Sequence, residues 1–317
     1  LLGKAHPSGY AVAMRRRMTM REITASYSDT KRQNERFDLW LYHVGRRLSW
    51  PVAWVAVNLG ISATGVTFIS AAFVWAGALL IALGDPTWQL IGALCFQLWI
   101  IFDCADGSIA RATGTGSKRG EYADAFGGYS VSMLLYSSMG IAGARTVLGL
   151  DTVVPYILGL LGVTPGAGEA TGAVMSAGGA LDFIPVSTVI PAVAVLLAGV
   201  GASLFSLYAR LLYQKFLNIF EDSARKARPI KPREDRSNPV MVAAQNLAAN
   251  SGFALPLSII ALATDRAPLY AAFYLVVNGG MLLLTIRRTL TRKATAGLEE
   301  PGVSLDIAGP GAAGDDG

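Results

Sequence analysis

The sequence predicts an all-α, polytopic integral membrane protein with six transmembrane helices preceded by an amphipathic juxtamembrane helix. Of its 317 residues, 52% are hydrophobic and only 15% are charged, whereas a soluble domain normally carries about 25% charged residues. Several apolar stretches reach the roughly 20 residues that a helix needs to cross a bilayer. Helices are expected because they satisfy their own backbone hydrogen bonds inside the membrane.

The six spans follow one another along the chain as apolar stretches bounded by polar or charged residues. Ser62 is a suitable N-cap for the first of them. Residues 151–163 are apolar but too short to span, which suits a re-entrant or interfacial segment. The predicted spans are residues 63–83, 88–111, 121–143, 183–213, 240–264 and 268–286.

Lysine and arginine residues lie almost entirely on one side of this six-span plan. Of the 27, all except Arg145 and Arg266 fall on the same side as the N-terminus. This asymmetry is the positive-inside pattern of membrane proteins. It predicts a multi-pass protein of the cell (plasma or inner) membrane with both termini cytoplasmic. It also explains the net charge of +5 without a nucleic-acid partner.

The flanking regions differ in composition from the membrane domain. Residues 33–49 alternate apolar and charged side chains, which predicts a helix lying on the inner surface of the lipid bilayer. The run Asn278-Gly279-Gly280 suits a close helix contact, and we expect a homodimer. The expected regions are a cytoplasmic extension (1–32), an amphipathic juxtamembrane region (33–60), a six-helix membrane domain (61–290) and a disordered cytoplasmic tail (291–317).

Three carboxylates lie where the second and third predicted spans meet. Asp103 and Asp106 are three residues apart and therefore share one face of the second span's inner end. Asp124 follows about one turn into the third span, at the same boundary. Charge at that depth is costly, so such a cluster indicates a functional site. Hard oxygen ligands of this kind suit Mg²⁺ or Mn²⁺.

Small and basic residues accompany these carboxylates. Gly107 and Ala110 keep the helix surface narrow, so that a substrate or a neighbouring helix can approach closely. Arg111 lies one turn beyond Gly107, and the turn that follows ends in Lys118 and Arg119. A divalent ion flanked by arginine and lysine suits a pyrophosphate-containing substrate. The alternative is that the carboxylates only form salt bridges with these three basic residues.

Together these residues resemble the signature of the CDP-alcohol phosphotransferase family, D-x2-D-G-x2-A-R-x8-G-x3-D-x3-D. Gly120 supplies the glycine after the eight-residue gap, and every fixed position matches except the last, where this chain has Gly128. The span plan and the amphipathic helix extend the resemblance over residues 33–290.

The resemblance implies transfer of a substituted phosphate group from a CDP-activated donor to an acceptor alcohol, with release of CMP. The donor would be CDP-diacylglycerol or a CDP-alcohol, and the product would belong to phospholipid or membrane-glycoconjugate biosynthesis. Asp103, Asp106 and Asp124 would bind Mg²⁺ or Mn²⁺, and motif positions 107, 110 and 111 would line the cytidine and diphosphate site. The full set of expected substrate-binding residues is Gly107, Ala110, Arg111, Lys118, Arg119, Gly120 and, at the inner end of the fourth span, Arg210.

The missing fourth carboxylate leaves three interpretations open. In that family the last aspartate helps to bind metal and deprotonates the acceptor hydroxyl, and Gly128 can do neither. In the first, the enzyme is active because Glu121 is a substitute base or because the acceptor is already ionised. Alternatively the chain is a catalytically silent member that binds CDP-lipid or acts as a membrane partner subunit, since loss of a general base costs about 10²–10⁴-fold in rate. In the third interpretation, Gly128 is an engineered or sequence-specific change in an otherwise ordinary enzyme of the family. The adjacent Gly127 and Gly128 would then leave room for a bulky group near the site.

Overall fold

The computed structural model describes residues 17–150, 186–225 and 239–290, and within these ranges every regular element is a helix. The expectations for residues 1–16 of the extension, for residues 151–163 and for the tail 291–317 fall outside the described residues. The helices, with two π-helical turns labelled η, are α2 (Met20–Ala25), α3 (Asp29–Glu35), η1 (Leu41–Gly45), α4 (Arg46–Asn58), α5 (Ala63–Leu83), α6 (Pro86–Thr113), α7 (Lys118–Leu148), α10 (Val186–Arg225), α11 (Pro239–Ala248), η3 (Asn250–Ala254), α12 (Leu255–Ala263) and α13 (Ala267–Leu290).

Short capping residues define where the long helices begin and end. The side chains of Ser62, Asp85 and Ser117 accept hydrogen bonds from the first-turn amides of α5, α6 and α7, which satisfies amide donors that have no partner within the helix. Gly114 and Gly149 end α6 and α7 in the left-handed conformation, with φ of 66° and 69°, a conformation that glycine adopts without strain. The predicted N-cap at Ser62 is therefore confirmed.

The fold class predicted from composition is confirmed, with one correction to the span plan. Five helices are long and apolar enough to cross a membrane: α5, α6, α7, α10 and α13. The stretch 240–264, expected to be one span, is a pair of helical segments bent by 67°, and it is a sixth span if the pair crosses the membrane as one. The two segments meet at Ala249, whose φ and ψ of −80° and 131° are extended. Gly252, with φ and ψ of −94° and −131°, is also not helical. A Cβ at Gly252 would lie 2.1 Å from the carbonyl oxygen of Asn246, so the sharp approach of the two halves depends on glycine.

Close helix contacts hold the bundle together through small residues. On α5 and α6, a Cβ at Gly77 would lie 2.7 Å from the carbonyl oxygen of Gly92. On α7 and α10, a Cβ at Gly140 would lie 2.8 Å from the Cα of Gly199. Such contacts are how helices associate in a bilayer, where the hydrophobic effect gives little drive. The predicted close contact at Asn278 is made within the chain, because its side chain donates to the carbonyl of Ala202 on α10.

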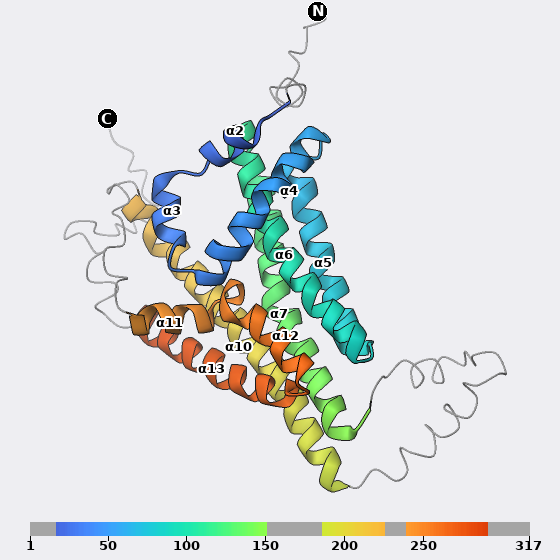
Figure 1. Cartoon of the computed structure of the whole chain (residues 1–317). Helices are drawn as coiled ribbons and strands as arrows, with labels where there is room; N and C mark the ends of the chain where they lie inside the picture. The colour runs from blue at the N-terminus through green and yellow to red at the C-terminus, as the bar shows by residue number, and fades with distance from the viewer. Residues whose placement is uncertain (1–16, 151–185, 226–238, 291–317) are drawn as a thin grey trace, which may run out of the picture.

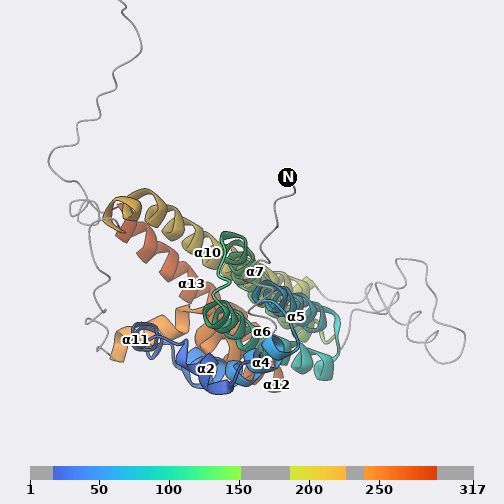
Figure 2. The ribbon, with the colours of Figure 1, turned by 90° about the horizontal axis from the view of Figure 1, so that it is seen from above.

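The amphipathic juxtamembrane region forms two helical segments and not the single helix expected over 33–49. A turn at residues 36–38 separates α3 from the segment that runs through η1 into α4. Asn246 of α11 accepts from the amide of Leu39 and donates to the carbonyl of Phe37. Its side chain therefore replaces helical hydrogen bonds at the break. Viewed from above, α2, α4 and α11 lie along one side of the bundle, and α10 and α13 lie along another (Figure 2).

The alternating direction of the long helices determines where a site can form. The start of α5, the end of α6 and the start of α7 meet at one end of the bundle, and α2, α3 and α4 lie at that same end (Figure 1). The signature residues 103–128 are thereby brought beside the juxtamembrane helices.

Candidate functional site

A cavity of about 650 Å³ opens at this end of the bundle, a size within the usual range of ligand pockets. Residues of α3, η1, α4, α5, α6 and α7 and of the turn between α6 and α7 line it. Most of the residues expected from the signature are among them: Asp103, Asp106, Gly107, Ala110, Arg111, Lys118, Gly120, Glu121 and Asp124. The predicted binding residues Arg119 and Arg210 do not line the cavity.

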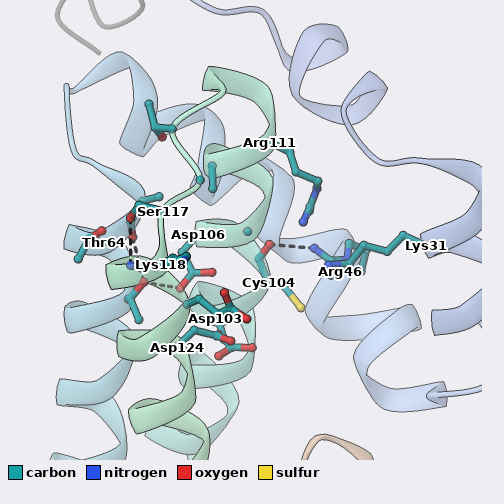
Figure 3. Close-up of a pocket in the computed structure, with 18 of the residues that line it drawn as sticks. Lys31, Arg46, Thr64, Asp103, Cys104, Asp106, Arg111, Ser117, Lys118 and Asp124 are labelled. Atoms are coloured by element: carbon teal, nitrogen blue, oxygen red, sulfur yellow. Dashed lines mark hydrogen bonds between the residues drawn. The ribbon is translucent and has the colours of Figure 1, made fainter. Parts of the chain in front are cut away.

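The three carboxylates converge from two helices. Asp103 and Asp106 come from the last turns of α6 and Asp124 comes from the second turn of α7, and their side chains point toward one another (Figure 3). Asp106 is the most deeply placed of the three, with 6% of its surface exposed. The hydroxyl of Thr67 on α5 donates to Asp106 Oδ2 over 2.6 Å. A third helix therefore fixes the orientation of this carboxylate.

Among the described residues, no basic side chain forms an ion pair with any of these carboxylates. Within the described ranges, the ion pairs are Lys31–Glu35, Arg32–Asp29 and Arg46–Glu35. The alternative in which the signature carboxylates form salt bridges with Arg111, Lys118 and Arg119 is therefore not what the structure shows. Several uncompensated negative charges in one partly buried place are unfavourable unless a cation joins them.

The donor chemistry of the cluster fits a hard divalent cation, since all three groups are carboxylates. They do not form a ready-made ligand set as placed: among the described residues, no group of three or more His, Cys, Asp or Glu side chains is arranged to hold a metal ion. Asp124 is exposed and free to change its side-chain torsions, whereas Asp106 is fixed by Thr67. Metal binding would therefore draw Asp124 toward the two carboxylates of α6.

Arg111 is prepared for an anionic ligand. In the described part of the chain it makes one long hydrogen bond, from Nη2 to the hydroxyl of Ser108 over 3.4 Å, and its buried Nε has no acceptor. A buried donor without a partner is costly, and a phosphate oxygen would supply the acceptor. Gly107 makes room for this side chain, because a Cβ there would lie 3.1 Å from Arg111 Nη1.

Sequence reasoning missed a second group of charged residues, which the juxtamembrane helices bring to the cavity. Lys31 and Glu35 of α3 and Arg46 of α4 all line it, and Lys31 and Arg46 approach from the side opposite the α7 start (Figure 3). Lys31 lies in the expected cytoplasmic extension (1–32), whereas Glu35 and Arg46 lie in the segment expected on the bilayer surface. No spacing relates any of them to the signature. The alternation of charge within 33–49 was the only signal available.

Arg46 fastens these helices to α6. Its Nε and Nη2 donate to the two carboxylate oxygens of Glu35 over 2.9 and 2.8 Å, and its Nη1 donates to the carbonyl of Cys104 over 2.8 Å. Arg46 is only 4% exposed. The bidentate pair with Glu35 is the strong form of this interaction. The separate Nη1 bond reaches Cys104, the residue after Asp103.

Lys31 carries a perturbed charge at the mouth of the cavity. Burial lowers the pKa of the Lys31 ammonium, and the nearby positive charge of Arg111 lowers it further. Both effects disfavour the protonated form. An anion bound between Lys31 and Arg111 would relieve their repulsion.

The position of the missing fourth carboxylate is filled by a cation. The guanidinium of Arg210 lies against Gly128, where a Cβ would be 2.6 Å from Nη2, and Nη1 donates to the Gly128 carbonyl over 3.1 Å. The guanidinium carbon Cζ of Arg210 also lies 5.2 Å from the centre of the Tyr129 ring. The space beside Gly128 is filled by the Arg210 side chain, and neither Gly127 nor Gly128 is among the described residues that line the cavity. A Cβ at Gly127 would meet nothing within 4 Å.

Comparison with known protein families matches residues 61–208 to the family described as CDP-alcohol phosphatidyltransferase. The matched region begins just before α5, includes the whole signature and ends on α10 two residues before Arg210. No curated protein matches the chain.

Proposed function

The chain belongs, through residues 61–208, to the CDP-alcohol phosphatidyltransferase family, and from this premise we propose that it transfers a substituted phosphate group from a CDP-activated donor to an acceptor alcohol and releases CMP. CDP-diacylglycerol or a CDP-alcohol is the proposed donor. The observation that carries the proposal is the convergence of three carboxylates beside Arg111. Among the described residues, these carboxylates have no ion-pair partner and the buried Nε of Arg111 has no acceptor.

Asp103, Asp106 and Asp124 are proposed to hold Mg²⁺ or Mn²⁺. When bound, the metal would stabilise the negative charge that develops on the diphosphate as CMP departs. The protein's part is to place oxygen ligands on two helices and to fix one of them through Thr67. Fixed ligands lower the cost of reorganisation during the reaction.

The basic residues around the cluster are proposed to position the donor. Arg111 and Lys118 flank the three carboxylates from the end of α6 and the start of α7, and both are able to contact phosphate oxygens. Beside these basic residues the helix surfaces carry only small residues, which leaves room for a ligand: Gly107, Ala110 and Gly120. Arg119 is exposed outside the cavity lining, where it would contribute to the surrounding positive field and not to a direct contact.

Glu121 is the proposed acceptor of the hydroxyl proton, because it lines the same cavity one turn before Asp124. The second candidate function is that of a silent family member that binds CDP-lipid or serves as a membrane partner subunit. The guanidinium at position 128 favours this candidate, because arginine stays protonated and cannot act as a base.

We also propose the membrane arrangement that charge predicts. The cavity lies at the end of the bundle that carries α3 and α4, where lysine and arginine are concentrated. Both termini and the site would then face the cytoplasm across the cell membrane, and the protein would work as a homodimer.

The proposal is tested by CMP release from CDP-diacylglycerol by the full chain in lipid nanodiscs, with Mg²⁺ or Mn²⁺ and a panel of acceptor alcohols. We expect metal-dependent release that chelation with EDTA abolishes. Gly128→Asp is assayed in parallel. Release by Gly128→Asp alone would identify a silent chain that kept its binding site, and release by neither protein would overturn the transferase assignment.

Lys31 gives the donor affinity a predictable pH dependence. Because the pKa of Lys31 is lowered, its charge is present at lower pH and is lost on the alkaline side sooner than that of an ordinary lysine. We expect the KM for CDP-diacylglycerol to rise as the pH passes upward through this pKa. In Lys31→Arg the rise should vanish, since arginine stays charged. An unchanged alkaline rise in Lys31→Arg would show that another group is responsible.

A further inference from the structure

Gly128 and Arg210 form a matched pair, because one residue makes the position of the other possible. A Cβ at position 128 would lie 2.6 and 3.0 Å from the two terminal nitrogens of Arg210, closer than a side-chain carbon tolerates. Any residue other than glycine would displace the guanidinium from this place. Glycine is otherwise a costly choice inside a helix, by about 1 kcal/mol relative to alanine.

A partly buried chain of hydrogen bonds holds the Gly128 carbonyl that Arg210 contacts. The Gly128 carbonyl accepts from the hydroxyl of Ser132 over 3.2 Å as well as from Arg210. Ser132 in turn accepts from the side-chain amide of Asn250, whose oxygen accepts from the Tyr136 hydroxyl over 2.9 Å. Asn250 belongs to η3, so the break in the fifth predicted span contributes to this anchor. Arg210 is therefore held in position and does not merely lie on the surface.

The anchored guanidinium has donors to spare. Arginine carries five N–H groups, and the described part of the chain shows one of them in a hydrogen bond, to the Gly128 carbonyl. The ion pairs of the described residues leave Arg210 without a carboxylate partner within 4 Å, although Asp103 lies within electrostatic range. The side chain is also exposed. These are the features of a cation available to an anionic ligand.

The location of Arg210 separates it from the proposed donor site. Arg111 and Lys118 line the cavity and Arg210 does not. Gly128 lies one helical turn beyond Asp124, so Arg210 approaches the carboxylate cluster from α10, on another side. Two groups of cations thus flank the metal-binding carboxylates. If the first group holds the diphosphate, the second faces the position of the attacking substrate.

We propose that Arg210, seated on Gly128, is a specificity-determining residue that binds an anionic group, a phosphate or a carboxylate, on the acceptor. The inference rests on the proposed function and names the class of acceptor. An aspartate at position 128 would remove a proton, whereas the guanidinium there recognises charge. The proton of the attacking hydroxyl then leaves through another group, for which Glu121 is proposed above.

The test is a calorimetric titration of the full chain in phosphatidylcholine nanodiscs containing CMP and Mn²⁺. Glycerol 3-phosphate and glycerol serve as a matched anionic and neutral pair. We expect only glycerol 3-phosphate to bind measurably, and Arg210→Gln to weaken its binding about 10–100-fold, as for a charge-assisted hydrogen bond. Gly128→Ala should weaken it similarly by displacing the guanidinium. Gly127→Ala is the control, since its new Cβ meets nothing within 4 Å.

Several results would overturn the inference. Equal affinity for the two ligands, equal affinity of native and Arg210→Gln protein, or equal effects of Gly127→Ala and Gly128→Ala would each do so. Arg210→Lys keeps the charge and guards against misfolding, and it should bind more tightly than Arg210→Gln. Adding phosphatidic acid to the nanodiscs distinguishes a lipid phosphate from a soluble one, because a lipid ligand would compete with glycerol 3-phosphate. Binding of CMP and Mn²⁺ is recorded separately, so that failure of the donor site is not mistaken for failure of the acceptor site.

Discussion

Asp106→Asn should reduce metal-dependent CMP release by about 10³-fold or more. Asparagine preserves the size of the side chain and the position of its oxygen near Thr67, so the change removes mainly the negative charge. A catalytic metal supplies several kcal/mol of transition-state stabilisation, and each 1.36 kcal/mol corresponds to a factor of ten in rate. Asp106 is the most buried of the three carboxylates and is oriented by a hydrogen bond of 2.6 Å. It should therefore be the least replaceable.

Thr67→Val provides a graded comparison for this variant. Valine matches threonine in shape but loses the hydroxyl that donates to Asp106. Loss of a group that orients a metal ligand typically costs 10–100-fold, and we expect an effect of about that size. Initial rates of CMP release at saturating Mn²⁺, together with thermal midpoints, separate catalysis from folding. A well-folded Asp106→Asn protein that retained a tenth of the native rate would contradict the assignment of Asp106 as a metal ligand.

Hydropathy predicted the long helices well because each one is a nearly continuous apolar stretch. The first span was expected at residues 63–83, and α5 has those bounds. The errors occurred where a tertiary contact replaces a local preference. The stretch 240–264 carries no charged residue, yet it bends at Ala249. The helix expected over 33–49 breaks where Asn246, some 200 positions away in the chain, binds its backbone.

In the candidate site, too, residues related by local spacing could be predicted from the sequence, whereas residues brought in by tertiary packing could not. Spacing within one helix placed Asp103 and Asp106 together, and a short turn brought Asp124 beside them. These relations are local and can be inferred from the sequence. Arg46 reaches the cavity and Arg210 reaches Gly128 from other helices through packing, and no spacing rule connects either arginine with the signature. The occupant of the space beside Gly128 could be identified only in the structure.

Glu35→Gln should destabilise the protein by about 3–5 kcal/mol, the usual cost of breaking a buried ion pair by removing one partner. The Arg46 and Glu35 side chains are 5% and 14% exposed and form a bidentate pair, and the Tyr27 hydroxyl also donates to Glu35. Glutamine keeps the shape but leaves the guanidinium without a counter-charge. The free energy of unfolding, measured by chemical denaturation in mixed micelles, checks this value. Because α3 also carries Lys31 to the cavity, we expect the affinity for CMP to fall in the same variant.

Asp29→Asn is the matched control on the same helix. Asp29 also pairs with an arginine, Arg32, but the two side chains are 86% and 53% exposed. Water and salt screen such a pair, and its loss should cost less than about 1 kcal/mol. The contrast between two carboxylate-to-amide changes on α3 therefore measures burial and not charge alone. Equal effects of Glu35→Gln and Asp29→Asn would show that the Arg46–Glu35 pair does not fasten the juxtamembrane helices to α6, and the link between these helices and the cavity would have to lie elsewhere.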